Sequence, residues 1–291
     1  MNCIVSGGTG FIGRHIVARL RESGHTVFVW SRKAAPPFAW DPLQSEPSPE
    51  SLEGVDAVIH LAGETVAQRW NDDVKRRIAD SRILGTRRLV DAISRMEPRP
   101  KVLVSASAVG YYGDRDGTVL TEASSPGKGF LVDVCRQWEA EADRAAEFGL
   151  RVMKLRIGFV LGKDGGALAS MLPPFRAFVG GRLGSGKQWM PWVHVVDVAH
   201  MFAYAMENQV SGVWNATAPN PVTNDEFTAE MSRILHRPAI FTVPPFALKL
   251  AFGEMGQHML DSARVVPDAP FKHAYVFHYP TLDRALRNLL T

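Results

Sequence analysis

The stretch Val5-Ser6-Gly7-Gly8-Thr9-Gly10-Phe11-Ile12-Gly13 joins a short apolar run to an amphipathic segment that extends to Arg21. A strand that ends in closely spaced glycines and leads into a helix is typical of a phosphate-binding loop, because the N–H groups of the first helical turn and the helix dipole face the anion. We expect Gly7 to allow the tight turn, Gly10 to let the backbone approach a pyrophosphate, and Gly13 to let helix and strand pack closely. The spacing G-x-x-G-x-x-G departs from the common G-x-G-x-x-G fingerprint, and an ordinary glycine-rich turn is the alternative. Its position on a strand-to-helix junction favours a dinucleotide site.

The end of the second expected strand, Thr26 to Trp30, indicates which dinucleotide fits. An acidic residue there would bind the ribose 2′-hydroxyl of NAD, whereas this sequence has Ser31, Arg32 and Lys33. A hydroxyl, a guanidinium and an ammonium suit a 2′-phosphate. The residues therefore predict NADP(H) as the cofactor, and a charged surface turn is the alternative.

Strand and helix patterns alternate over the first 170 residues. Further strands are expected at 56–63, 102–107 and 151–157, with a weakly marked one at 38–40. Helices are expected at 70–96, kinked near Gly85, and at 130–148. From residue 171 onward, glycines, aromatics and prolines break the chain into short elements. We predict an α/β protein with a Rossmann-type doubly wound parallel sheet in residues 1–170, to which 192–217 return, and a smaller C-terminal α+β substrate lobe in 171–291.

Composition and charge argue against several classes of function. The net charge of +3 is small against 33 basic and 30 acidic residues, and no basic block is interleaved with aromatics, so we expect no nucleic-acid partner. No apolar run approaches a membrane span, and no histidine pair has metal-ligand spacing. The two cysteines do not indicate a disulfide framework, and a strand beginning at residue 2 leaves no signal peptide. We expect a cytoplasmic monomer or homodimer that acts on a small molecule, without membrane or metal.

Several stretches resemble the short-chain dehydrogenase/reductase superfamily in its extended, sugar-nucleotide-epimerase-like branch. These are the glycine loop, Leu61-Ala62-Gly63, Gly85-Thr86, Arg156 to Gly162 and Trp192 to Ala199. A closer similarity, to an atypical subgroup of epimerase-family proteins with an extra C-terminal domain, rests on Ala62-Gly63-Glu64, Ser81-Arg82, Ser107 to Gly113, Trp138-Glu139, Gly165-Gly166 and Gly184-Ser185-Gly186. The resemblance covers essentially the whole chain. With the strand-end residues, it implies a cofactor-binding set of Gly7, Thr9, Gly10, Phe11, Ile12, Gly13, Ser31, Arg32, Leu61, Ala62, Gly63, Arg82, Ser105 and Val160.

The proton-transfer pair of that superfamily, Tyr-x-x-x-Lys, is absent from this sequence. None of the five tyrosines has a lysine four residues later. Alignment from Trp138 places Leu131 and Cys135 near the positions of that tyrosine and lysine, and Arg82 replaces the asparagine of Asn-x-x-Gly-Thr.

Substitute groups lie near the expected site. Ser107 follows the pattern of the superfamily's hydrogen-bonding serine, and Tyr111 or Tyr112, for each of which loop packing is the alternative, comes within a few residues of it. Glu64 is a candidate acid or base, with a helix-capping carboxylate as the alternative. We expect an NADP(H)-dependent oxidoreductase or epimerase-like enzyme that transfers hydride with a small polar carbonyl or hydroxyl substrate. The alternative is an NADP(H)-binding sensor or regulatory protein with little or no turnover.

Overall fold

A six-stranded parallel sheet forms the centre of the computed structural model, which describes residues 1–291 apart from the side chain of Phe271. Its strands are β1 (Asn2–Ser6), β2 (Thr26–Trp30), β3 (Ala57–His60), β4 (Val102–Ala108), β6 (Arg151–Ile157) and β11 (Gly212–Ala216), in the order β11-β6-β4-β3-β1-β2. The chain runs outward in both directions from β1, so the topological switch point lies at the carboxyl end of β1. This arrangement confirms the predicted doubly wound α/β fold, and β11, late in the sequence, pairs with β6.

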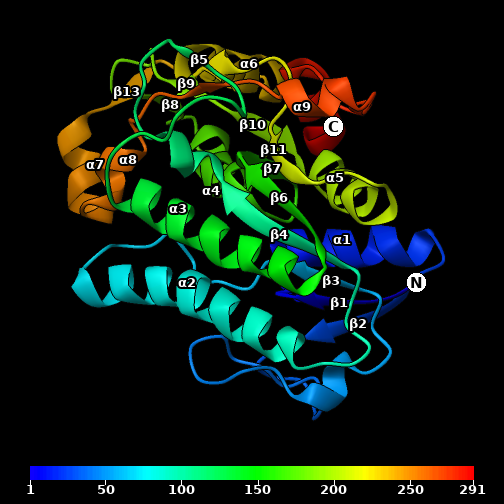
Figure 1. Ribbon diagram of the computed structural model, residues 1–291. Coiled ribbons are helices and arrows are strands. Elements are labelled where there is room, and N and C mark those ends of the chain that lie inside the picture. The colour runs from blue at the N-terminus through cyan, green and yellow to red at the C-terminus, as the bar shows by residue number, and fades with distance from the viewer.

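Helices cover both faces of the sheet (Figure 1). The helices α1 (Phe11–Glu22) and α5 (Val195–Glu207) pack on one face, and α2 (Asp72–Ser94) and α3 (Phe130–Asp143) pack on the other. The period-2 alternation of a strand divides β1 between two cores, because Cys3 and Val5 face α1 and α5 while Ile4 faces α2. Packing in both cores therefore fixes the orientation of β1 and of the glycine loop that follows it.

One expectation about local structure was wrong. Residues 38–40 form no strand, because only an isolated bridge joins Ser31 to Ala39 before Trp40 turns into the core. Helix α2 continues through Gly85 without a break. The glycine instead admits a neighbouring loop, since an added Cβ would lie 2.7 Å from Cβ of Pro42.

The remaining elements of the described chain are short. The strands are β5 (Val119–Leu120), β7 (Phe159–Gly162), β8 (Gly181–Leu183), β9 (Trp189–Met190), β10 (Trp192–His194), β12 (Val222–Thr223), β13 (Phe241–Val243) and β14 (Arg264–Val265). The helices are α4 (Gly166–Arg176), α6 (Asn224–Leu235), α7 (Pro245–Phe252), α8 (Met255–His258), α9 (Asp268–Lys272) and α10 (Leu282–Leu290). Single turns of 3-10 helix occur at η1 (Pro49–Leu52), η2 (Val109–Tyr112) and η3 (Arg144–Phe148).

One buried residue attaches the segment 275–279 to α5. Asp197 is fully buried and accepts the backbone N–H groups of His278 at 2.7 Å and Tyr279 at 3.0 Å. Tyr275 adds a bond from its hydroxyl to the Asp197 carbonyl. The acid of the Trp192 to Ala199 stretch therefore has a structural role that joins distant parts of the chain.

Among the described residues, no helix is long and apolar enough to cross a membrane. Within the same residues, no group of three or more histidine, cysteine, aspartate or glutamate side chains is placed to hold a metal ion. Both cysteines are buried free thiols.

Candidate cofactor and substrate site

The glycine loop lies between β1 and α1 at the switch point. Gly7 has a φ of +68°, which favours glycine, and its carbonyl accepts the N–H of Gly10 at 2.9 Å. A Cβ on Gly13 would lie 2.1 Å from that same carbonyl oxygen. No side chain caps the helix at Gly10, and Thr9 is exposed. The first-turn N–H groups, including those of Phe11, therefore remain open to a phosphate.

A buried polar pair supports this loop from the neighbouring strand. The Ser6 hydroxyl accepts the backbone N–H groups of Leu61 at 3.0 Å and Ala62 at 3.1 Å, and lies 2.7 Å from His60 Nδ1. His60 Nε2 lies 3.0 Å from the Thr86 hydroxyl. Burial lowers the pKa of His60 to about 3, so the ring is neutral at pH 7. Sequence reasoning missed this support, for which a histidine inside an otherwise apolar strand was the only signal.

The end of β2 presents two unpaired cations. Arg32 and Lys33 are exposed, and neither side chain makes a hydrogen bond or ion pair within the described residues. The Ser31 hydroxyl accepts the backbone N–H of Lys33 at 3.2 Å, which keeps the turn after Trp30 compact. Fixed backbone and free positive charge are the properties that a 2′-phosphate site needs.

Arg82 is a half-buried arginine on α2 that forms no ion pair with a carboxylate among the described residues. Its Nη1 donates to the carbonyls of Glu64 at 2.9 Å and Ile78 at 3.2 Å, and its Cζ lies 5.2 Å from the centre of the Trp138 ring. Burial lowers the pKa of Arg82. Its other N–H groups have no acceptor in the described part of the chain. They lie against Gly63, where an added Cβ would be 3.1 Å from the guanidinium carbon, so an anion at this strand end could bind them.

Phe11 connects the glycine loop to the loop after β7. Added Cβ atoms on Gly162 and Gly165 would each lie 2.5 Å from the Phe11 ring. Asp164 of the same loop forms an ion pair with Arg14, one turn further along α1. The glycines of this loop therefore make room for an aromatic side chain of the cofactor motif. Val160, predicted to contact cofactor, lies in β7 and is buried.

A charged network is buried beneath the end of β4. The Ser107 hydroxyl donates to Glu139 Oε1 at 2.6 Å, and Glu139 forms a bidentate ion pair with Arg156, with both N–O distances 2.8 Å. Arg156 Nη1 donates to the Tyr112 hydroxyl at 3.0 Å, which donates to Asn215 Oδ1 at 2.7 Å. Burial opposes the charge of Arg156, yet its bonds to Glu139 raise its pKa. Ser107 is therefore a buried member of an ion-pair network.

Tyr111 is the one predicted catalytic residue whose hydroxyl is free of partners in the described chain. Its half-buried ring lies over Arg156, with Cζ 3.4 Å from the ring centre. The rings of Tyr111 and Tyr112 form a T-shaped pair, with their centres 5.3 Å apart. The geometry fixes the Tyr111 ring and leaves the phenol oxygen available to a ligand.

Helix α3 places Leu131 and Cys135 against the turn that carries Tyr111. Leu131 Cβ lies 3.4 Å from where a Cβ on Gly110 would be, and the Cys135 thiol donates to the Ala108 carbonyl at 3.7 Å. Burial raises the pKa of that thiol to about 12, which makes it a poor nucleophile. The face of α3 where the superfamily has its tyrosine and lysine therefore lies against this turn, but the side chains on it, Leu131 and Cys135, are chemically inert.

Glu64 and Ser105 are the remaining predicted site residues. Glu64 precedes α2 by eight residues and so does not cap it, because Asn71 does. Its carboxylate accepts Gln68 Nε2 at 3.0 Å. Ser105 is fully buried and donates to the Ala106 carbonyl, so it stands inside the sheet.

Glu139 and Arg156 are the site residues that sequence reasoning did not assign. In the sequence, Trp138-Glu139 supported only the similarity to the atypical subgroup. Arg156 was only the first residue of a stretch that resembles the superfamily. An arginine within the apolar run of β6 was a usable signal, because a buried arginine requires an acidic partner.

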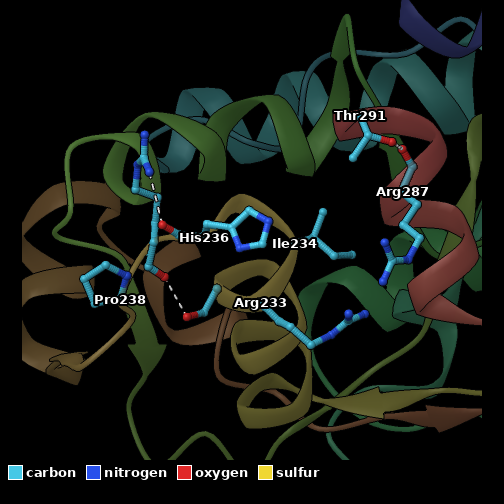
Figure 2. A pocket seen from close by; sticks show the side chains of 8 residues that line it. Arg233, Ile234, His236, Pro238, Arg287 and Thr291 are labelled. Atoms are coloured by element: carbon cyan, nitrogen blue, oxygen red, sulfur yellow. Dashed lines mark hydrogen bonds between the residues drawn. The ribbon is translucent and has the colours of Figure 1, made fainter.

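A separate surface hollow of about 470 Å³ lies between α6 and α10 (Figure 2). Arg233, His236, Arg237 and Arg287 line it, and none of them is a predicted site residue. Arg233 and Arg287 both pair with Asp283, so much of its positive charge is already neutralised.

Comparison with known proteins follows the same division of the chain. A family model described as NAD dependent epimerase/dehydratase matches residues 3–217, and a domain of unknown function, DUF1731, matches 243–289. The chain is 42% identical to an Arabidopsis thaliana protein named "Epimerase family protein SDR39U1 homolog, chloroplastic", covering 100% of this chain and 87% of that protein. It is 37% identical to "Epimerase family protein YfhF" of Bacillus subtilis, covering 100% and 98%. A crystal structure of human epimerase family protein SDR39U1 with NADPH is 33% identical, covers 99% of both chains and superposes with a TM-score of 0.90.

Proposed function

The chain belongs to the NAD-dependent epimerase/dehydratase family, and we propose that it binds NADP(H) and transfers hydride to or from a small polar carbonyl or hydroxyl substrate. The proposal rests on Arg32 and Lys33, two cations at the end of β2 that have no partner among the described residues. They lie beside the glycine loop, where no side chain caps the first turn of α1. A human protein of the same architecture, 33% identical to this chain, was solved with NADPH, which supports the choice of dinucleotide.

The chain's own residues divide into a binding set and a proton-transfer set. The first-turn N–H groups of α1 would hold the pyrophosphate, Arg32 the 2′-phosphate, and Arg82 a further phosphate or ribose oxygen. The bound nicotinamide supplies or accepts the hydride. Tyr111 would donate or accept the proton at the substrate oxygen through its unpartnered hydroxyl. Ser107 would act indirectly, by holding Glu139 and thereby Arg156 under the Tyr111 ring.

A fluorescence titration of purified protein with NADPH and with NADH tests the cofactor assignment. We expect NADPH to bind at least tenfold more tightly, a difference of about 1.4 kcal/mol, and Arg32→Ala to remove that preference. Arg76→Ala is the matched control, because Arg76 is also an exposed arginine, on α2, and its one ion pair within the described residues is with Asp73. Equal affinity for the two nucleotides in the unmodified protein would disprove the 2′-phosphate assignment.

The second candidate function is an NADP(H)-binding sensor with little turnover. It is favoured by Leu131 and Cys135, an apolar side chain and a buried thiol on the helix face where the superfamily has its tyrosine and lysine. Oxidation of bound NADPH by a panel of aldehydes and ketones distinguishes the two candidates. Turnover that Tyr111→Phe abolishes, with NADPH affinity unchanged, supports the enzyme, whereas tight NADPH binding with no turnover supports the sensor.

A further inference from the structure

Exposed apolar side chains gather at the end of the molecule that carries β8, β13 and α7, on the side away from both termini (Figure 1). Of the eleven large apolar side chains that are exposed among the described residues, seven belong to the segments 178–179 and 240–252. Ile240 is 81% exposed, Phe246 73% and Leu250 74%. Single exposed apolar residues are ordinary, whereas a group of them marks an interaction site.

Helix α7 is almost wholly apolar and yet mostly exposed. Lys249 is the only polar residue of its eight, and Leu248 is the only buried one. Phe246 and Leu250 are four residues apart, so they share one face of the helix, and that face is open to solvent. A helix that is apolar all round is normally buried. The outward face of α7 is therefore left uncovered by the described chain.

The strands β8 and β13 join the two apolar segments. Gly181 pairs with Phe241, and an added Cβ on Gly181 would lie 2.0 Å from the Phe241 carbonyl oxygen, so the two backbones are in direct contact. Arg237, just before β13, lies over the ring of Phe178, with Cζ 4.5 Å from the ring centre. Helix α7 follows β13 after Pro244. We call this surface the apolar end, made by Phe178, Val179, Ile240, Phe241, Phe246 and Leu250.

The charge around the apolar end has one sign. Residues 173–187 and 236–253 together contain five lysines and arginines and no aspartate or glutamate. Arg176 and Lys249 are exposed, and neither side chain makes a hydrogen bond or ion pair within the described residues. The carboxylates that adjoin these segments are already in ion pairs, Asp225 with Arg182 and Glu254 with Lys75.

We propose that the apolar end docks on the surface of an anionic phospholipid bilayer, with the outward face of α7 inserted among the headgroups. Apolar side chains enter the acyl boundary while lysine and arginine meet the lipid phosphates, so an apolar face with a cationic rim complements such a membrane. A second copy of the chain would instead place like charges opposite one another. This inference goes beyond the proposed function and does not depend on it.

The length of α7 sets the depth of this contact. Eight residues of helix rise about 12 Å, whereas the hydrocarbon core of a bilayer is about 30 Å thick. The helix would therefore lie in the interface. The expectation of no membrane partner rested on the lack of a spanning apolar run, and an interfacial surface does not need one.

Flotation of NADPH-saturated protein with vesicles of phosphatidylglycerol and phosphatidylcholine tests the proposal. We expect binding to the mixed vesicles that weakens as salt rises, and at least tenfold weaker binding to vesicles of phosphatidylcholine alone. Phe246→Ser combined with Leu250→Ser should lower the partition coefficient on mixed vesicles at least tenfold, and Lys249→Glu at least fivefold. The controls are Val276→Ser, at an exposed valine after α9, and Lys101→Glu, at an exposed lysine before β4. Both should bind as the unmodified protein does.

A label at position 246 separates insertion from adsorption by charge alone. Both native cysteines are buried, so Phe246→Cys supplies one reactive thiol for a polarity-sensitive fluorophore. We expect its emission to shift to the blue on mixed vesicles, and no shift from the same label on Val276→Cys. Vesicle binding without a shift at position 246 would show that α7 does not insert and would overturn the proposal.

Oligomeric state and stability supply the remaining readouts. Light scattering should find the same mass for the unmodified protein and for the double serine variant, and the Tm of that variant should be unchanged or higher. A dimer that the double substitution dissociates would assign this face to a second copy and overturn the proposal. A fall in Tm of several degrees would show that the face is packed within the molecule, and absence of vesicle binding would overturn the proposal directly. Because NADPH binding is measured separately, each of these failures leaves the proposed function standing.

Discussion

The close packing of the cofactor loop depends on the absence of a side chain at Gly13. A Cβ there would lie 2.1 Å from the Gly7 carbonyl oxygen and 2.7 Å from Gly8 Cα, both backbone atoms that no rotamer change can move. We expect Gly13→Ala to lower the free energy of unfolding by about 1–3 kcal/mol, as overpacking of a rigid site does, and to weaken NADPH binding at least tenfold. Urea unfolding and nucleotide titration measure the two effects.

Gly117→Ala is the control for this substitution. Its added Cβ would meet only Trp189 Nε1 at 3.6 Å, an ordinary contact, and its φ does not lie in the left-handed region. Its stability should remain within about 0.5 kcal/mol of the unmodified protein. If Gly13→Ala binds NADPH as tightly as this control does, the close helix–strand contact does not matter for the site.

Single residues were predictable where a motif fixed their backbone position. The spacing of the glycine loop placed Gly7 and Gly13 correctly, because each depends on a local conformation. Glu139 and Arg156 could not be paired from the sequence, since they come from a helix and a strand whose contact exists only in the folded sheet. The same contact explains why Ser107, placed correctly at a strand end, has its hydroxyl turned into the interior.

At the scale of elements, α5 is the helix that holds the C-terminal segment in place. Asp197 is buried among apolar side chains and accepts two backbone N–H groups from residues 278 and 279. Asp197→Ala would leave these two partly buried donors without their acceptor, at up to about 1–3 kcal/mol each. We expect a total loss of about 2–5 kcal/mol by urea unfolding, and faster proteolysis within 273–281 while residues 1–160 stay protected.

Asp268→Ala is the comparison for that experiment, because among the described residues the Asp268 carboxylate pairs only with the exposed Lys272. Such a surface pair contributes little, so stability should change by less than about 1 kcal/mol. Proteolysis that is equally slow in Asp197→Ala and in this control would show that the apolar contacts of Tyr275 hold the segment without the carboxylate.

Elements with strong periodicity were predictable, and those defined by tertiary packing were not. The apolar runs of β4 and β6 and the helical period of α2 persist in the structure, because each pattern is local. Residues 38–40 looked like a strand because two aromatics flank an alanine. Those aromatics instead fill the space beside α2, with the Trp40 and Trp30 ring centres 5.3 Å apart. Gly85 likewise suggested a kink, but its lack of a side chain instead leaves room for the loop at Pro42.

Across the whole molecule, two buried polar systems connect the sheet to its surroundings. Ser6, His60 and Thr86 join β1, β3 and α2 beneath the glycine loop. The network around Arg156 continues through Asn215, whose Nδ2 donates to the Val266 carbonyl at 3.0 Å. Glu122 accepts the N–H of Asn215 and that of Asp268, so it bridges the sheet and the C-terminal segment. The proposed reaction end is therefore fixed by both sequence regions that the family models match.

The pH dependence of the free energy of unfolding tests whether water is excluded from the buried system of Ser6, His60 and Thr86. Burial lowers the pKa of His60 to about 3, whereas an unfolded chain protonates the same ring near 6.5. The unfolded state therefore binds more protons below pH 6.5, and stability falls as the pH drops from 6.5 toward 3, by about 2 kcal/mol at pH 5 for this group. Urea unfolding of the unmodified protein and of His60→Gln at pH 7 and pH 5 measures it, with His236→Gln, an exposed histidine, as the control. We expect the loss between the two pH values to be about 2 kcal/mol smaller in His60→Gln, whatever its absolute stability, and unchanged in the control. An equal loss in all three proteins would mean that water reaches His60 and that the support beneath the cofactor loop is open.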